Sequence, residues 1–238
     1  MSNNPCSTAH RHQIEACARQ FPDYAAFAHG LAYVLDHASA STLKNAGLDS
    51  TRIDSPVLMV AGGAASMKPE EMIHVTALLK EALAGFGGTV ICGGTTAGVP
   101  GCIGEATVYL ANASIKKFRL LGYIPKSLPK DAVKDNRYDK LIMSDTTRFS
   151  PVQVLHAWQD VLASGIKPED VRLLGFGGGK IAAFEYRLAL SLGATVGVVM
   201  GSGVAVDELL EDVLWCTPRG LHLVRLPADP KSLFAFVV

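Results

Sequence analysis

Hydrophobic positions fall into two alternating kinds of segment along most of the chain. Short apolar runs that end in glycine or a small polar residue predict buried strands at 55–63, 89–94, 118–125, 141–145, 171–176 and 195–200. Longer segments with apolar residues three or four positions apart predict helices at 69–86, 101–114, 150–165 and 181–193, and another near Val204. This alternation predicts an α/β fold, a Rossmann-like, doubly wound, mainly parallel sheet with helices on both faces.

The first fifty residues follow a different pattern. Residues 8–46 predict two helices that are broken at Phe21-Pro22, because proline disfavours a helical conformation of the residue before it. The polar segment 43–56 is rich in turn-forming residues and marks a boundary. We therefore predict an N-terminal helical extension over residues 1–54 and one Rossmann-like domain over residues 55–238. Segment 126–140 has no periodicity, and we expect a surface loop there.

Composition narrows the class of protein. The 238 residues are 49% apolar and 18% charged, and the formal net charge is zero. Lys and Arg are scattered, which argues against a nucleic-acid partner. No apolar run reaches the roughly 18 residues that span a membrane, and the polar N-terminus has no signal-peptide core, so we expect a cytoplasmic protein without a membrane partner. Five dispersed cysteines and seven dispersed histidines predict reduced thiols, no metal and no cofactor.

Two glycine-rich turns carry the candidate chemistry. CGGTTAGVPGCIGEA (92–106) and GFGGGK (175–180) each follow a predicted strand and lead into a predicted helix. Glycine lets a ligand approach the backbone, and the N–H groups at a helix start attract an anion such as phosphate. Since the carboxyl ends of parallel strands meet at one edge, we expect one shared crevice. The candidate ligand-binding residues are Gly62, Gly63, Gly93, Gly94, Thr95, Thr96, Gly98, Asp145, Gly177, Gly178, Gly179, Lys180, Glu185, Gly201, Ser202 and Gly203.

Polar residues beside these turns suggest individual roles. Lys180 would bring a positive charge to a phosphate, Asp145 or Glu185 would accept hydrogen bonds from ribose hydroxyls, and Ser202 with the backbone of 201–203 would contact a second phosphate. Structural explanations remain open for each. Lys180 can be solvated, Asp145 and Ser202 can cap the helices that follow them, and Glu185 can pair with neighbouring helix charges.

These turns resemble those of the SLOG superfamily, which includes the LOG enzymes, the Smf/DprA proteins and the amino-terminal domain of TRPM channels. The resemblance covers about residues 55–225. The first turn is most similar to the TRPM type, through Gly93, Gly94, Thr95, Gly98, Val99, Gly104 and Glu105. GGGKIAAFE is similar to the second LOG motif, with Gly178 and Gly179 as its paired glycines and Glu185 as its acid, whereas Gly177, Ile181 and Ala182 depart from it. The resemblance implies a Rossmann-like, prokaryotic TRPM-like domain.

The resemblance implies two functions. The first is a sensor that binds a nucleotide-derived small molecule, ADP-ribose-like or a cyclic nucleotide, in signalling or defence. The alternative is a phosphoribohydrolase that cleaves a nucleoside monophosphate, using Glu185 with an arginine. The predicted helix 150–165 contains no Arg or Lys, and Arg148 is the nearest substitute. Loss of a placed cation weakens the hydrolase reading, so we favour binding over catalysis. A dinucleotide oxidoreductase ranks last, because AGGAAS lacks a Gly-x-Gly-x-x-Gly motif.

Oligomeric state stays open at this point. Phe21, Phe27, Leu31, Leu35 and the final SLFAFVV (232–238) are more apolar than a small extension can bury alone. They either pack on the main domain or form a symmetric homodimer.

Overall fold

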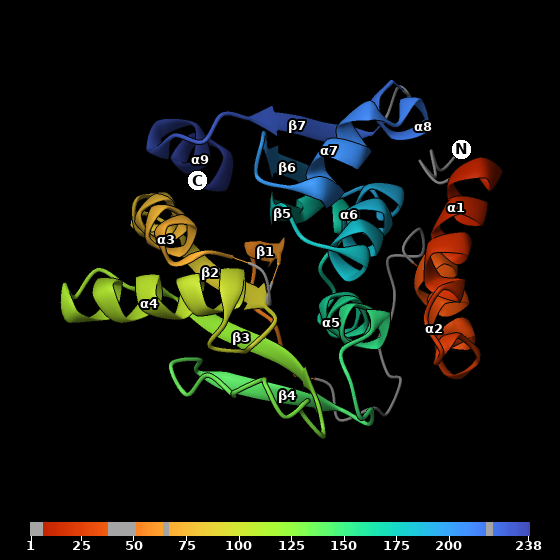
Figure 1. The fold of residues 1–238 in the computed structure, drawn as a ribbon, viewed down its shortest axis with the longest axis horizontal. Helices are drawn as coiled ribbons and strands as arrows, with labels where there is room; N and C mark the ends of the chain where they lie inside the picture. The colour runs from red at the N-terminus through yellow and green to blue at the C-terminus, as the bar shows by residue number, and fades with distance from the viewer. Residues whose placement is uncertain (1–6, 38–50, 64–66, 218–220) are drawn as a thin grey trace.

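Seven parallel strands form one sheet in the order β4-β3-β2-β1-β5-β6-β7 (Figure 1). The computed structural model describes all residues except 1–6, 38–50, 64–66 and 218–220. The strands are β1 (Val57–Gly62), β2 (Gly87–Cys92), β3 (Lys117–Pro125), β4 (Lys140–Ser144), β5 (Val171–Phe176), β6 (Thr195–Val199) and β7 (His222–Leu226). Every adjacent pair is parallel. The prediction of a doubly wound, Rossmann-like α/β fold is confirmed.

Helices connect these strands in the predicted rhythm. They are α1 (Thr8–Arg19), α2 (Tyr24–His37), α3 (Pro69–Leu83), α4 (Gly98–Asn112), α5 (Pro151–Ala163), α6 (Lys180–Leu192), α7 (Val204–Glu211), α8 (Val213–Cys216) and α9 (Pro230–Val237), with a short 3-10 helix at Pro168–Asp170. The break at Phe21-Pro22 is confirmed, and residues 38–46 of the predicted second helix lie outside the described residues. α6 ends at Gly193, which has φ 101° and so adopts the left-handed conformation that favours glycine.

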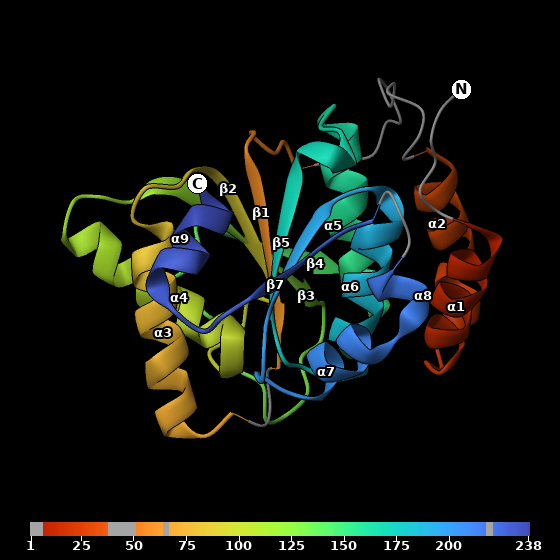
Figure 2. The same cartoon turned by 90° about the horizontal axis from the view of Figure 1, so that it is seen from above.

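Side chains from alternate strand positions feed two cores on opposite faces of the sheet. Helices α3, α4 and α9 cover one face, and α5, α6 and α7 cover the other (Figure 2). On β1, Leu58 belongs to the first core and Met59 to the second, because successive strand residues point to opposite faces. Both faces are therefore buried, as the near-continuous Val, Ile and Leu runs predicted.

The N-terminal helices form an outer layer on the second face. α1 packs on α6 and α2 packs on α5 (Figure 2). Phe27, Leu31 and Leu35 are buried in the same core as α5 and α6. Leu233 and Phe236 of α9 are buried in the opposite core. Of the two fates that the sequence left open for these residues, they pack on the main domain, whereas the boundary at residues 54 and 55 stays a prediction.

Several elements differ from the sequence-based expectations: α8 and α9 were not predicted, and neither was β7. β7 was not predicted, because HLVRL lies at the sheet edge and among its residues only Leu226 is buried. The expected surface loop at 126–140 is irregular but anchored, since Asp135 is 1% exposed and binds Arg137 at 2.7 Å. Arg137 also pairs with Glu105 of α4. None of the described helices is long and apolar enough to cross a membrane.

Candidate functional site

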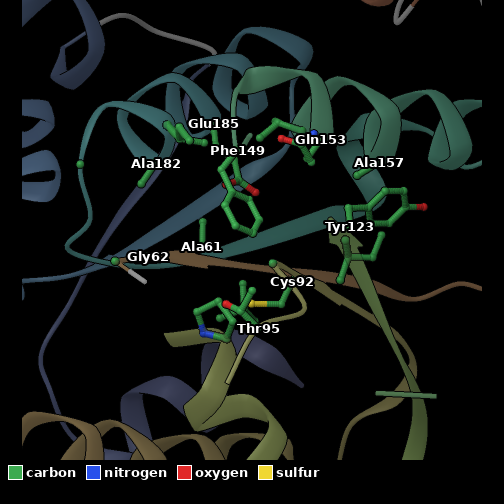
Figure 3. A pocket seen from close by; sticks show the side chains of 18 of the residues that line it. Ala61, Gly62, Cys92, Thr95, Tyr123, Phe149, Gln153, Ala157, Ala182 and Glu185 are labelled. Carbon is green, nitrogen blue, oxygen red and sulfur yellow. The ribbon is translucent and has the colours of Figure 1, made fainter. Parts of the chain in front are cut away.

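The strand order opens a cavity beside β1. The chain builds β1 to β4 outward in one direction and then returns to place β5 on the other side of β1. Segments that leave β1 and β5 therefore diverge, which creates a crevice at the carboxyl ends of these strands. A cavity of about 460 Å³ lies there (Figure 3). Its lining includes seven of the predicted ligand-binding residues, namely Gly62, Gly63, Gly93, Thr95, Gly179, Lys180 and Glu185.

Three helices begin at this cavity, but two of them satisfy most of their own first N–H groups. At the start of α4, the Val99 N–H donates to Gly63 O at 2.9 Å and Pro100 has no N–H. At the start of α5, the Ser150 side chain accepts from the backbone, and Gln153 Oε1 accepts from the Ser150 N–H at 2.8 Å. Neither helix therefore presents a full set of free donors to an anion.

The start of α6 differs from both. Its N-cap is Gly179, which has no side chain to accept hydrogen bonds. The N–H groups of Lys180, Ile181 and Ala182 bond to no other described residue. Lys180 is exposed at the cavity and forms no ion pair within the described part of the chain. Free N–H groups, the positive end of a helix dipole and an ammonium group together form an anion-binding corner.

Glu185 brings the cavity a carboxyl group without a partner. Its side chain is partly exposed to the cavity, where Figure 3 places it beside Phe149, and it forms no hydrogen bond to another described residue. Burial raises the pKa of Glu185 from 4.5 to about 8. The group is therefore mostly protonated at neutral pH, and it can both donate and accept a hydrogen bond.

The remaining walls are mainly apolar. Phe149 points its ring into the cavity, across from Cys92 (Figure 3). Burial raises the pKa of the Cys92 thiol to about 12, so this thiol stays neutral. Tyr123 contributes its ring, while its hydroxyl donates to Asp160 Oδ2 at 2.7 Å. Gln153 uses its amide nitrogen on Thr146 Oγ1 at 2.8 Å. A ring-shaped ligand would therefore meet aromatic and aliphatic surface with few competing polar groups.

Several predicted residues of the first glycine turn hold a neighbouring loop instead of lining the cavity. Gly94 O accepts from the Asp135 N–H at 3.1 Å, and the Thr96 N–H donates to Val133 O at 3.1 Å. Gly94 has φ 71°, and a Cβ there would lie 2.9 Å from Ile124 Cγ2. Gly98 starts α4 but is absent from the cavity lining. A ligand role for Gly94, Thr96 and Gly98 stays a prediction.

The charged candidates near β4 also lie outside the cavity lining. The Asp145 carboxylate is exposed, and its Oδ1 lies 3.5 Å from Lys126 Nζ. Arg148 Nε lies 3.6 Å from Asp23 Oδ1, in the turn between α1 and α2. A ligand role for Asp145 and a catalytic role for Arg148 stay predictions. Arg148 directly precedes Phe149, which lines the cavity.

The turn after β6 contacts the second glycine turn. Ser202 Oγ accepts from the Gly177 N–H at 2.8 Å, and Gly203 is the N-cap of α7. Gly177, Gly178, Gly201, Ser202 and Gly203 are absent from the cavity lining, so their contact with a ligand stays a prediction.

Sequence reasoning missed the aromatic residues of the site. Phe149 stands in the polar segment DTTRFSP, and a large apolar side chain just before a helix N-cap is the signal that could have found it. Tyr123 gave no such signal, because it lies within an apolar strand like any core residue. In the described residues, His, Cys, Asp and Glu form no group of three that could hold a metal ion.

Solved structures with the same fold include a carrier protein and a binding protein of the molybdenum cofactor. The chain is similar to the molybdenum cofactor carrier protein from Chlamydomonas reinhardtii, with 19% identity, a TM-score of 0.50, and coverage of 76% of this chain and 94% of that chain. It is also similar to the molybdenum cofactor binding protein from the phototrophic bacterium Rippkaea orientalis, with 16% identity, a TM-score of 0.50, and coverage of 76% and 93%. At these identities the likeness shows the fold alone.

No curated protein matches the sequence. The family model described as "SLOG in TRPM, prokaryote" matches residues 55–232, which include every residue of the cavity lining. A match to this family suggests that the protein binds a small molecule. Because the match covers most of the chain, the protein belongs to this prokaryotic SLOG family.

Proposed function

We propose that the cavity binds a nucleotide-derived small molecule, an ADP-ribose-like compound or a cyclic nucleotide, and that the protein is a cytoplasmic sensor in signalling or defence. The observation that carries the proposal is the open N-terminus of α6, which stands with Lys180 at a cavity of about 460 Å³ that also holds the Phe149 ring. A phosphate suits the first feature and a nucleobase suits the second.

The spacing along α6 supports this arrangement. Glu185 follows Lys180 by five residues, which corresponds to about 7.5 Å along a helix. With a phosphate at the helix start, Glu185 lies at the level of the sugar or of the near edge of the base. There a protonated carboxyl can donate to a ring nitrogen or a hydroxyl and accept from an amino group.

Isothermal titration calorimetry with a small panel tests the proposal. The panel contains AMP, adenosine, ADP-ribose and cyclic AMP, and also the molybdenum cofactor, because two proteins of this fold carry its name. We expect at least one phosphate-containing adenine compound to bind more tightly than adenosine. Absence of binding by folded protein to all four adenine compounds would refute the proposal, whether or not the molybdenum cofactor binds.

A phosphoribohydrolase is the second candidate, and the protonated Glu185 favours it. A carboxyl group with a pKa of about 8 can donate a proton to the departing base at neutral pH. Against this activity, Arg148 contacts Asp23, and Lys180 is the one cationic side chain of the described residues in the cavity lining. The ribosyl cation and its phosphate would thus have fewer charged partners than in a site with an arginine beside the acid.

Incubation with AMP followed by chromatography for free adenine separates the two candidates. A sensor binds AMP without releasing adenine. A hydrolase releases adenine in the wild-type protein and loses this activity in Glu185→Ala, whereas a release that survives this substitution excludes Glu185 as its acid.

A further inference from the structure

Gly177 is held on both sides of its backbone. Its N–H donates to Ser202 Oγ at 2.8 Å, and its carbonyl oxygen accepts from the Tyr186 hydroxyl at 2.8 Å. Gly177 has φ 55°, in the left-handed region, and a Cβ there would lie 2.3 Å from Ser202 O. The orientation of this glycine is therefore set by two side chains from different elements, one on α6 and one after β6.

Tyr186 also connects the two strands that flank the cavity. Its ring is fully buried and fills the notch at Gly175 of β5, where a Cβ would lie 2.8 Å from Tyr186 Cε1. Its hydroxyl lies 3.4 Å from Ala61 O of β1, besides its shorter bond to Gly177 O. One hydroxyl group thus bridges the ends of β1 and β5, where the sheet order reverses.

Elements behind the turn complete this support. Ser202 Oγ donates to Val199 O at the end of β6, and the Ala205 N–H of α7 lies 3.4 Å from Gly178 O. Gly177, Gly178 and Gly179 have no side chains of their own to restrict them, so without these contacts the turn would sample many conformations. A turn that must become ordered on binding weakens affinity, because the ordering cost is subtracted from the contact energy.

We propose that Tyr186 and Ser202 are positioning residues for the phosphate of the ligand. They hold the turn 177–179 so that the first N–H groups of α6 face the cavity before a ligand arrives. This inference rests on the proposed function, because it assigns no role unless an anion binds at α6. It also gives Ser202 a supporting role in place of the direct phosphate contact that the sequence suggested.

Tyr186→Phe tests the inference through the ratio of AMP affinity to adenosine affinity. Removal of the hydroxyl keeps the buried ring but frees Gly177 O, so we expect AMP affinity to fall roughly 2- to 10-fold while adenosine affinity stays unchanged. Ser202→Ala should lower the same ratio, and Ser202→Thr should restore it, because threonine keeps the acceptor oxygen and the site is exposed to solvent. A purely structural role would not change this ratio.

Tyr138→Phe is the matched control. Tyr138 is also buried, and its hydroxyl donates to Pro100 O at 2.9 Å, beside the first glycine turn. We expect this variant to lose stability as Tyr186→Phe does while it keeps the wild-type ratio, because α4 offers few free donors to a phosphate.

Amide hydrogen exchange in the ligand-free protein supplies a second measurement. The Gly177 N–H should exchange faster in Tyr186→Phe than in the wild-type protein, because the turn loses one of its two anchors. Wild-type protein that binds AMP no more tightly than adenosine defeats the proposed function, and with it the phosphate role of both residues. A wild-type preference for AMP that persists in Tyr186→Phe, with unchanged Gly177 exchange, overturns the positioning role alone.

Discussion

Glu185 links the charge of the cavity to the stability of the fold. Its pKa is about 8 in the folded protein, against an ordinary value of 4.5, so the folded state holds the proton more tightly than the unfolded state. The stabilisation is complete below about pH 4.5 and is lost as the pH rises through about 8. We expect Glu185→Gln to remove this loss, which is on the order of 5 kcal/mol in the free energy of unfolding, at about 1.4 kcal/mol for each pKa unit.

Urea denaturation at pH values from 4 to 9 measures the effect. Glu81→Gln is the control, because Glu81 is an exposed residue of α3, and it should leave the pH dependence of the wild-type protein unchanged. A Glu185→Gln variant that still loses stability over this range would show that another group is responsible.

Lys180 should affect ligand affinity without affecting stability. We expect Lys180→Ala to weaken AMP binding roughly 10- to 150-fold, because a charge-assisted hydrogen bond to phosphate is lost. The melting temperature should barely change, since Lys180 is exposed and forms no ion pair among the described residues. Lys167→Ala is the control. Lys167 precedes β5, so it lies at the opposite end of this strand from Lys180. An AMP affinity of Lys180→Ala equal to that of the wild-type protein would show that the Lys180 side chain does not bind the phosphate, which the backbone N–H groups would then bind alone.

Phe149 should affect the base rather than the phosphate. We expect Phe149→Ala to weaken AMP and adenosine equally, by roughly 5- to 150-fold, because stacking on an aromatic ring contributes about 1 to 3 kcal/mol per base. Calorimetry with both compounds gives the two changes. A loss confined to AMP would contradict stacking at this position.

Lys180 and Glu185 could be predicted as site residues because they stand in a glycine-rich motif. The position of the Phe149 ring, in contrast, depends on how the segment before α5 folds over the cavity.

At the scale of elements, the loop 126–139 stabilises the turn between β2 and α4. Asp135 is 1% exposed and receives two hydrogen bonds from the Arg137 side chain, at 2.7 and 2.8 Å. We expect Arg137→Met to lower the free energy of unfolding by about 1 to 3 kcal/mol, because it leaves a buried carboxylate without its charged partner. Urea denaturation checks this, and calorimetry should show an unchanged ratio of AMP to adenosine affinity. A changed ratio would mean that the first glycine turn also contacts the phosphate.

Strands β1 to β6 could be predicted because their apolar runs end in turn residues, and β7 could not because an edge strand is half exposed. The sequence could not predict that the first glycine turn bonds to other segments of the chain while the second leaves N–H groups open to a ligand, and the reason is a different one. The acceptor for Val99 N–H is Gly63 O, and the partner of Thr96 N–H is Val133 O, both far away along the chain. A glycine motif predicts that the backbone is accessible, but only the fold decides whether a ligand or another segment takes its donors.

For the whole molecule, the N-terminal helices should unfold together with the sheet. Leu31 is 2% exposed in the core that α5 and α6 share. We expect Leu31→Ala to lower the free energy of unfolding by about 2 to 5 kcal/mol within one transition. Circular dichroism during urea unfolding tests this, with the exposed Val213→Ala as control. A separate early transition would show that the extension unfolds independently of the sheet.

The homodimer stays a prediction, which light scattering at micromolar concentration checks.

One side of helix α5 lines the cavity, and the other side packs on α2. Val154 and Ala157 line the cavity, while Leu155 lies beside Gly30 of α2. Reciprocity then applies to any coupling between the two sides: if docking of α2 tightens the ligand by some factor, the ligand tightens docking of α2 by the same factor. An AMP affinity that is lower in Leu31→Ala than in the wild-type protein would therefore show that AMP favours the docked helices.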